Sequence, residues 1–122
     1  MVRILVVDDE PMIRWSIQQT LGAAGHEVAV AETVAEGESL LPGFDPDVVF
    51  LDVRLPDGSG LDVLRQIRQC GAHAPAVILM TAYADSCSAA EARQLGAFAY
   101  LQKPFDFEQL ETLADTAGHA RR

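Results

Sequence analysis

The chain places an apolar run, Ile4-Leu5-Val6-Val7, directly before an acidic segment and a proline, Asp8-Asp9-Glu10-Pro11. Apolar residues without polar alternation are typical of a strand covered on both faces, as in a parallel sheet. A proline at this point is typical of the first turn of a helix. The segment therefore predicts a buried strand, a polar loop and then a helix.

This order recurs along the chain. Four further apolar runs occupy residues 28–30, 48–51, 76–80 and 98–101. The amphipathic segments between them predict helices, which run from Pro11 to near Gly25, from an N-cap at Thr33 to Leu41 before Pro42-Gly43, from the turn 56–58 to before Gly71, from about Asp85 to Leu95, and from about Asp106 onward. Five β-α repeats predict one α/β domain over residues 1–122, a doubly wound five-stranded parallel sheet with right-handed crossovers.

The helical spacing also predicts which side chains face the sheet. These residues are Ile13, Ile17 and Leu21 in the first helix, Leu61, Leu64 and Ile67 in the third, Ala89, Ala92 and Leu95 in the fourth, and Phe107, Leu110, Leu113 and Ala117 in the last. Because the fourth helix buries mainly small side chains, we expect it to dock weakly and to move easily.

Composition narrows the function. The 122 residues carry nine Lys plus Arg against eighteen Asp plus Glu, a net charge of −9. This balance argues against binding of nucleic acid or anionic lipid by this domain, because phosphate contacts need clustered basic residues. No apolar run approaches the roughly 18 residues of a membrane span, and we expect a cytoplasmic protein. Cys70 and Cys87 lack metal-site spacing and are expected to be free thiols.

Doubly wound sheets carry their sites at the carboxyl ends of the strands. Polar residues follow four of the predicted strands at this edge: Asp8-Asp9-Glu10, Asp52, Thr81 and Lys103. Carboxylates about 4 Å apart repel by about 4 kcal/mol at an effective dielectric constant of 20, which favours a bound cation, Mg²⁺ above all. One carboxylate could then attack a phosphoryl donor, while Lys103 and the cation stabilise the transferring charge.

Each of these residues also has an ordinary structural interpretation. Acidic residues before a helix match its dipole, Thr81 could be a simple strand-end hydroxyl, and Lys103 could be a solvated amine. Their joint placement at four strand ends favours a common site.

Several motifs together resemble the receiver domain of two-component response regulators, over essentially the whole chain. They are Asp8-Asp9-Glu10-Pro11, Asp52 followed by Leu55-Pro56-Asp57-Gly58-Ser59-Gly60-Leu61, Met80-Thr81-Ala82-Tyr83, and residues 96–105 ending in Lys103-Pro104-Phe105. The resemblance implies the flavodoxin-like receiver fold with strand order 2-1-3-4-5. It also implies a phosphoacceptor domain that catalyses its own modification and is not a turnover enzyme.

The resemblance assigns a role to each matched position. Asp52 would be the phosphoacceptor, and Asp9 and Asp52 would ligate Mg²⁺ (or Mn²⁺) directly, with Asp8 acting through a water and Arg54 through its backbone carbonyl. Thr81 and Lys103 would contact the phosphoryl group, and Tyr100 would be the aromatic switch. A cis bond is expected at Lys103-Pro104.

A finer resemblance links residues 13–17, 80–83 and 103–107 to receivers of sigma-54-dependent activators, although Ala99 replaces a commonly acidic residue. That class implies an AAA+ ATPase and a DNA-binding output domain. Because the chain stops at Arg121-Arg122, we expect it to be the N-terminal fragment of a longer regulator.

The family implies a sensor histidine kinase as the phosphoryl donor. It further implies that phosphorylation remodels the face formed by the fourth helix, fifth strand and fifth helix, with a possible phosphorylation-dependent homodimer. A stand-alone receiver acting as a phosphorelay intermediate remains an open alternative.

Two other classes fit less well. A flavodoxin-type carrier is rejected, because Asp8-Asp9-Glu10 would repel a flavin phosphate. A haloacid-dehalogenase-type phosphatase needs a second aspartate where this chain has Arg54.

The side chains of Arg54 and Trp15 each allow two interpretations. The Arg54 side chain is either a plain surface charge or a group overhanging Asp52. Trp15 is expected to be partly exposed, either at a kinase contact or along the helix flank. No chemistry is assigned to the three histidines, His26, His73 and His119.

Overall fold

Each of the five apolar runs forms a strand of one parallel sheet in the computed structural model, which describes residues 2–69, 71, 74–82 and 89–121. The strands are β1 (Arg3–Val7), β2 (Glu27–Ala31), β3 (Val48–Asp52), β6 (Ala76–Thr81) and β7 (Ala99–Gln102). Their order across the sheet is β2-β1-β3-β6-β7, and every neighbouring pair is parallel. The predicted doubly wound fold and strand order 2-1-3-4-5 are confirmed.

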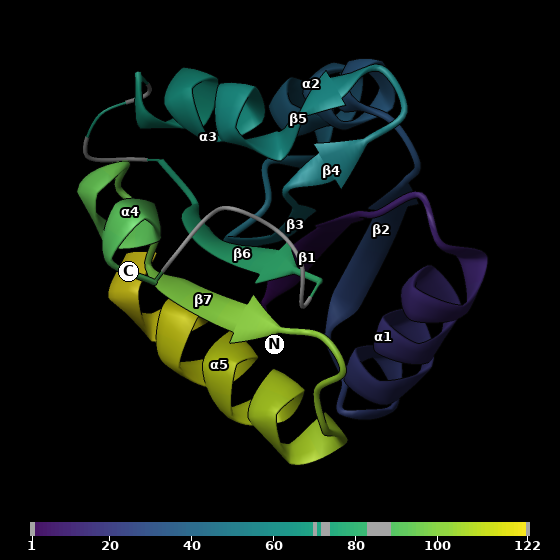
Figure 1. Ribbon diagram of the computed structural model, residues 1–122. Helices are drawn as coiled ribbons and strands as arrows, with labels where there is room; N and C mark the ends of the chain where they lie inside the picture. The colour runs from purple at the N-terminus through teal and green to yellow at the C-terminus, as the bar shows by residue number, and fades with distance from the viewer. Residues whose placement is uncertain (1, 70, 72–73, 83–88, 122) are drawn as a thin grey trace.

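Helices cover both faces of the sheet (Figure 1). One layer contains α1 (Pro11–Ala23) and α5 (Phe107–Arg121), and the other contains α2 (Val34–Phe44), α3 (Gly60–Arg68) and α4 (Ala89–Gln94). Alternate strand residues face the two layers, so that Leu51 and Leu79 belong to the core under α2–α4, whereas Phe50 and Met80 belong to the core under α1 and α5. None of the described helices is long and apolar enough to cross a bilayer.

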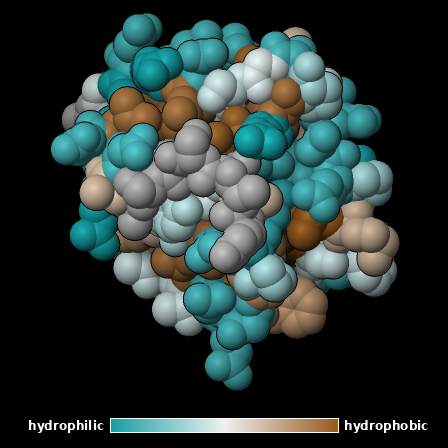
Figure 2. Space-filling view, in the orientation of Figure 1, coloured by the Kyte–Doolittle hydropathy of each residue, from teal (hydrophilic) through white to brown (hydrophobic). Residues whose placement is uncertain are grey.

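The predicted covering of every strand on both faces holds only in the centre of the sheet. All residues of β3 are buried, and so are all but the first of β1 and of β6. The edge strands β2 and β7 are mostly half-buried, because each has a neighbour on one side only. On the face shown in Figure 2, hydrophobic side chains form groups on a surface that is otherwise mainly hydrophilic.

The end of α2 differs from the prediction. Thr33 caps the helix as expected, with its side chain accepting from the backbone N–H of Glu36. The helix nevertheless continues through Pro42 to Phe44, and the chain leaves it at Asp45 with a φ of 50°. Pro42 has no N–H, so the last turn of the helix loses one backbone hydrogen bond. The earlier turns and the Thr33 cap do not depend on that bond, and the helix can therefore continue to Phe44.

Phe107 was expected on the buried face of α5 but is exposed. The buried stripe consists of Leu110, Ala114 and Ala117, with Leu113 partly buried beside it. Phe107 is the first residue of the helix, and helical side chains point back toward the N-terminus, so this ring projects away from the sheet.

The other predicted inward positions are mostly confirmed. Ile17, Leu21, Leu64, Ile67 and Ala92 are fully or nearly fully buried, and Ile13, Leu61 and Leu95 pack partly buried against the two cores. The expected helix start near Asp85, the side chain of Ala89, and Cys70, His73, Tyr83 and Cys87 lie outside the described residues.

A short hairpin after β3 was not predicted. Strands β4 (Arg54–Leu55) and β5 (Gly58–Ser59) pair antiparallel, and α3 begins directly after them at Gly60. A Cβ atom at Gly60 would overlap the backbone carbonyl of Asp52, so glycine is required for this close approach. The hairpin thereby returns the chain to the end of β3.

Candidate functional site

Three carboxylates from two segments meet at the carboxyl edge of the sheet. Asp8 and Glu10 lie in the loop after β1, and Asp52 is the last residue of β3. One carboxylate oxygen from each lies within 4.8 Å of those from the other two. Asp8 is completely buried and Asp52 is 5% exposed, so two of the three charges are largely shielded from water.

The ammonium group of Lys103 lies among these carboxylates. Its Nζ atom is 2.8 Å from Oδ2 of Asp8, 3.0 Å from Oε1 of Glu10 and 3.2 Å from Oδ2 of Asp52. The lysine directly follows β7, and its backbone N–H donates to the carbonyl of Thr81. Its peptide bond to Pro104 is cis, as the resemblance implied. The lysine thus reaches inward to charges from two other strands.

Burial dominates the electrostatics of the site. It raises the pKa of Asp52 to about 6, helped by the negative charge of Asp8 and opposed by Lys103 and by the Arg54 N–H. Burial likewise raises the pKa of Asp8, although Lys103 and the Glu10 N–H oppose this. Burial alone would lower the pKa of Lys103, but Asp8, Glu10 and Asp52 together raise it. Three acids therefore share one ammonium group, and a further cation near them would be stabilised by the remaining negative charge.

The Asp8 carboxylate provides a test of whether a metal ion fits. Its Oδ2 atom is buried and accepts no well-directed hydrogen bond, although Lys103 Nζ is close to it. The Lys103 ammonium group is shared with Glu10 and Asp52, so one positive charge faces three carboxylates and part of the negative charge is not offset. Oxygen-only donors are the ligands that Mg²⁺ prefers. The residues present therefore fit a hard divalent cation, which Asp8, Glu10 and Asp52 could hold.

Asp9, which the resemblance assigns as a direct ligand, is exposed and is not among these three. Glu10 takes part instead, and the sequence interpretation gave it no role of its own. The signal was present in the acidic run, but a run of three acids does not reveal which side chains turn inward. The direct-ligand role of Asp9 and the water-mediated role of Asp8 stay predictions.

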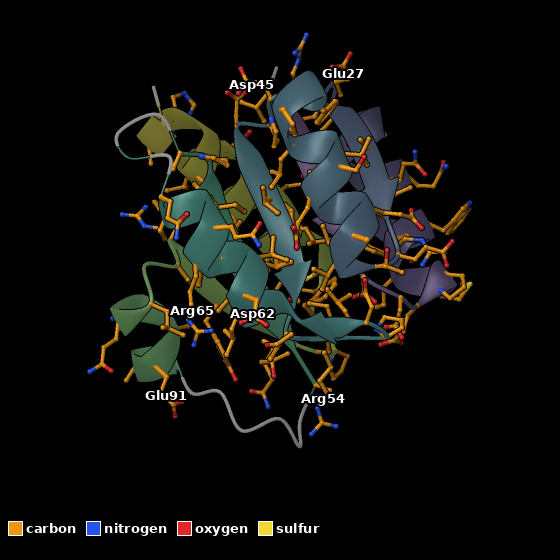
Figure 3. All side chains as sticks on the ribbon, turned by 90° about the horizontal axis from the view of Figure 1, so that it is seen from above. Glu27, Asp45, Arg54, Asp62, Arg65 and Glu91 are labelled. Carbon is orange, nitrogen blue, oxygen red and sulfur yellow. The ribbon has the colours of Figure 1, made fainter. Side chains whose placement is uncertain are left out.

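Arg54 contacts Asp52 through its backbone. Its N–H donates to Oδ1 of Asp52 over 3.2 Å. Its side chain is exposed and projects outward from the end of the molecule in Figure 3. This exposure is compatible with both interpretations of the side chain, and its role stays a prediction. The role of the Arg54 carbonyl as a ligand stays a prediction.

Thr81 lies on β6, which pairs with the Asp52 strand β3, and Tyr100 lies on β7, which pairs with the other edge of β6. Thr81 is fully buried at the end of β6, and its hydroxyl donates to the carbonyl of Ala82 over 3.2 Å. Tyr100 is partly buried on β7, opposite Leu79, and packs against the core under α2–α4. Thr81 is two residues after Leu79, so these two side chains face the same layer. Tyr100 pairs with Leu79 in register and faces that layer too, so Thr81 and Tyr100 lie on one face of the sheet. Their roles in phosphoryl contact and switching stay predictions.

Arg14 was missed by the sequence interpretation. Its guanidinium donates to the backbone carbonyl of Asp8 over 2.8 Å and so ties the acidic loop to α1. A bond to a backbone oxygen leaves no charge pattern in the sequence, which is why it could not be found there. Trp15, on the same helix, is 58% exposed, as expected.

Two histidines can be placed. His26 has a structural role, with Nδ1 accepting from the Val2 N–H and Nε2 lying 3.5 Å from Asp115. His119 is exposed on α5. Neither belongs to the acidic cluster.

Comparison with known proteins identifies the family of this fold and site. The family model described as "Response regulator receiver domain" matches residues 4–115. The chain belongs to this family. The resemblance stated from the sequence motifs is therefore confirmed.

Two longer regulatory proteins are among the relatives of this receiver. It is 41% identical over 114 residues to the "DNA-binding transcriptional regulator NtrC" of Escherichia coli K12, covering 93% of this chain and 24% of that protein. It is 41% identical over 115 residues to the "Response regulator protein PilR" of Pseudomonas aeruginosa, covering 94% of this chain and 26% of that protein. The receiver thus spans about a quarter of the length of these relatives.

Solved structures show the same fold. The beryllofluoride-activated NtrC4 receiver domain dimer superposes with a TM-score of 0.89 at 31% identity, covering 98% of both chains. The receiver domain of a LuxO repressor protein from Vibrio parahaemolyticus gives a TM-score of 0.89 at 28% identity, covering 98% of this chain and 92% of that one.

Proposed function

We propose that Asp52 of this receiver accepts a phosphoryl group from the phosphohistidine of a sensor histidine kinase, in a reaction that depends on Mg²⁺. The observation that best supports this role is the placement of Lys103 Nζ 3.2 Å from a buried Asp52 carboxylate, with Asp8 and Glu10 beside it. A nucleophilic carboxylate, a fixed cationic group and oxygen donors for a divalent ion are the parts that phosphoryl transfer requires.

In the proposed transfer, a carboxylate oxygen of Asp52 forms a bond to phosphorus while the phosphorus–nitrogen bond of the phosphohistidine breaks. The electron pair of the broken bond stays on the imidazole nitrogen, and Asp52 becomes an acyl phosphate. Lys103 is placed to offset negative charge on the phosphoryl oxygens, and Thr81 to donate its hydroxyl to one of them. When bound, Mg²⁺ supplies further charge neutralisation of the transferring group.

The same proposal covers signalling by the face that contains α4, β7 and α5. A phosphoryl group on Asp52 draws the Thr81 hydroxyl toward it, and Tyr100 then moves into the space behind Thr81. Two observations support this coupling: the two side chains face one layer of the fold, and the Lys103 N–H donates to the Thr81 carbonyl. Among the side chains of α4 that the structure describes, the buried one is the small Ala92, so little packing from them opposes displacement of the helix.

For the whole protein we propose a cytoplasmic sigma-54-dependent transcriptional activator, in which this receiver controls an AAA+ ATPase and a DNA-binding domain. NtrC and PilR among the relatives, and their greater length, support this proposal. We further propose that phosphorylation promotes a homodimer, which the dimeric NtrC4 receiver supports. The receiver itself would bind neither nucleic acid nor membrane, and it would be modified once per activation rather than turn over substrate.

Intact-protein mass spectrometry after incubation with acetyl phosphate and Mg²⁺ tests the proposal. We expect one phosphoryl group on the wild type and none on Asp52→Asn or in the presence of EDTA. Equal incorporation in the wild type and in Asp52→Asn would refute the assignment of Asp52. Asp62→Asn is the matched control, because Asp62 is an exposed residue of α3 whose carboxylate pairs with Arg65 instead of Lys103 (Figure 3).

A further inference from the structure

The tip of the β4–β5 hairpin is bound to the start of helix α2. Asp57 lies between the two short strands, and its carboxylate accepts two backbone hydrogen bonds, from Val34 N–H over 2.8 Å and from Ala35 N–H over 3.1 Å. These bonds join residues 23 and 22 positions apart. They hold the pKa of Asp57 below its ordinary value, so the carboxylate remains ionised at neutral pH.

Helix α2 is therefore capped from two places. The first N–H groups of a helix have no partner within it and need acceptors from outside. Thr33, the residue before the helix, accepts a hydrogen bond from Glu36 N–H over 3.1 Å. The Asp57 carboxylate accepts those from Val34 N–H and Ala35 N–H. Only the second cap connects α2 to another part of the chain.

The base of the hairpin contacts the site directly. Arg54 N–H donates to Asp52 Oδ1, and Gly60 N–H donates to the Val53 carbonyl. Strands of two residues are too short to be stable alone, so the hairpin needs anchors beyond its own pairing. Asp57 is such an anchor at the tip, opposite the base.

We infer that Asp57 is a positioning residue for the phosphoacceptor. By tying the hairpin tip to α2, it keeps the Arg54 N–H on the Asp52 carboxylate and holds that carboxylate in one orientation. Its importance for phosphoryl transfer rests on the function proposed above, whereas the mechanical link to Arg54 does not.

Amide hydrogen exchange measured by NMR tests the link without metal or phosphoryl donor. In EDTA, under conditions where the opening equilibrium limits exchange, we expect Arg54 N–H to exchange about tenfold faster in Asp57→Ala, as for loss of a charge-assisted hydrogen bond. Asp57→Asn, which keeps one acceptor oxygen, should recover part of the protection and also serves if the alanine variant folds poorly. The amide of Phe50 in the centre of β3 reports global stability, and its exchange should accelerate less than that of Arg54 in the same variant.

Thr33→Ala is the matched control. It removes a cap from the same helix but leaves the hairpin attached, so Arg54 exchange should stay within about twofold of the wild type. Unchanged Arg54 exchange in Asp57→Ala, or equal acceleration in Asp57→Ala and Thr33→Ala, would overturn the inference.

A second measurement connects the link to chemistry. We expect Asp57→Ala to be phosphorylated by acetyl phosphate several-fold more slowly than the wild type at the same Mg²⁺ concentration, and Thr33→Ala to match the wild type. If the wild type takes up no phosphoryl group, the proposed function fails while the exchange result still stands. If the wild type is modified but Arg54 exchange ignores Asp57, the inference fails alone.

Discussion

Lys103 Nζ lies 3.2 Å from Oδ2 of Asp52, although 51 residues separate them in the chain. The same ammonium group pairs with Asp8 and Glu10. One cation thus stabilises three acids from two other segments, and the site retains excess negative charge.

Replacing Lys103 by methionine should destabilise the metal-free protein. It leaves the buried carboxylates of Asp8 and Asp52 without their shared cation, and loss of one partner of a buried ion pair is costly. We expect the free energy of unfolding in EDTA at pH 8 to fall by about 2 kcal/mol, since Lys103 is slightly exposed and water offsets part of the loss. Urea denaturation measures this. A variant as stable as the wild type would contradict the role given to the ammonium group.

The metal-free protein should lose stability as the pH rises through the weakly acidic range. The pKa of Asp52 is about 6 when folded and 3.8 ordinarily, so between these values the folded protein keeps a proton that the unfolded chain has lost. The penalty grows across this window and is complete above it. In EDTA we expect Asp52 to cost about 1 kcal/mol between about pH 5 and pH 7.5. Urea titrations of the wild type and Asp52→Asn check this, and parallel pH curves for the two proteins would contradict it.

Magnesium affinity should separate Asp9 from Glu10. The family resemblance makes Asp9 a direct ligand, whereas the structure brings Glu10 into the acidic cluster with 58% of its side chain exposed. If Asp9 is a direct ligand, Asp9→Ala removes a metal–oxygen bond, and we expect it to weaken Mg²⁺ binding at least about tenfold. Glu10→Gln then removes only a water-screened charge near the ion, and we expect a loss of about threefold. Isothermal titration calorimetry measures both. A larger loss in Glu10→Gln would assign the metal to the cluster of Asp8, Glu10 and Asp52 without Asp9.

Gly60→Ala should be strongly destabilising. The added Cβ would overlap the carbonyl of Asp52, and a backbone atom cannot move aside as a flexible side chain could. We expect a loss of about 3 kcal/mol in unfolding free energy, measured by urea denaturation. Gly22→Ala, in α1 with no atom within 4 Å of the new methyl group, is the control and should be stabilising by up to about 1 kcal/mol. Equal effects of the two substitutions would refute the requirement for glycine beside Asp52.

Most of the fold was predictable because it depends on local patterns. Apolar runs without alternation located all five strands of the sheet, and Pro11 and Thr33 located two helix starts. Two local rules misled the prediction. Pro42 was expected to end α2, which continues to Phe44. Phe107 was expected on the buried face of α5 but is exposed on its first turn. The β4–β5 hairpin was missed because its strands are too short to leave a periodic signal.

The sequence by itself determined that Asp8, Asp52, Thr81 and Lys103 would share one edge, because the carboxyl ends of parallel strands meet there whatever the side chains do. Only the tertiary structure decided which acids turn inward, that Lys103 contacts three of them, and that Asp57 reaches α2. Such contacts join residues far apart in the chain, and they depend on loop paths and side-chain directions. No local pattern encodes those, since they arise only when all the elements pack together.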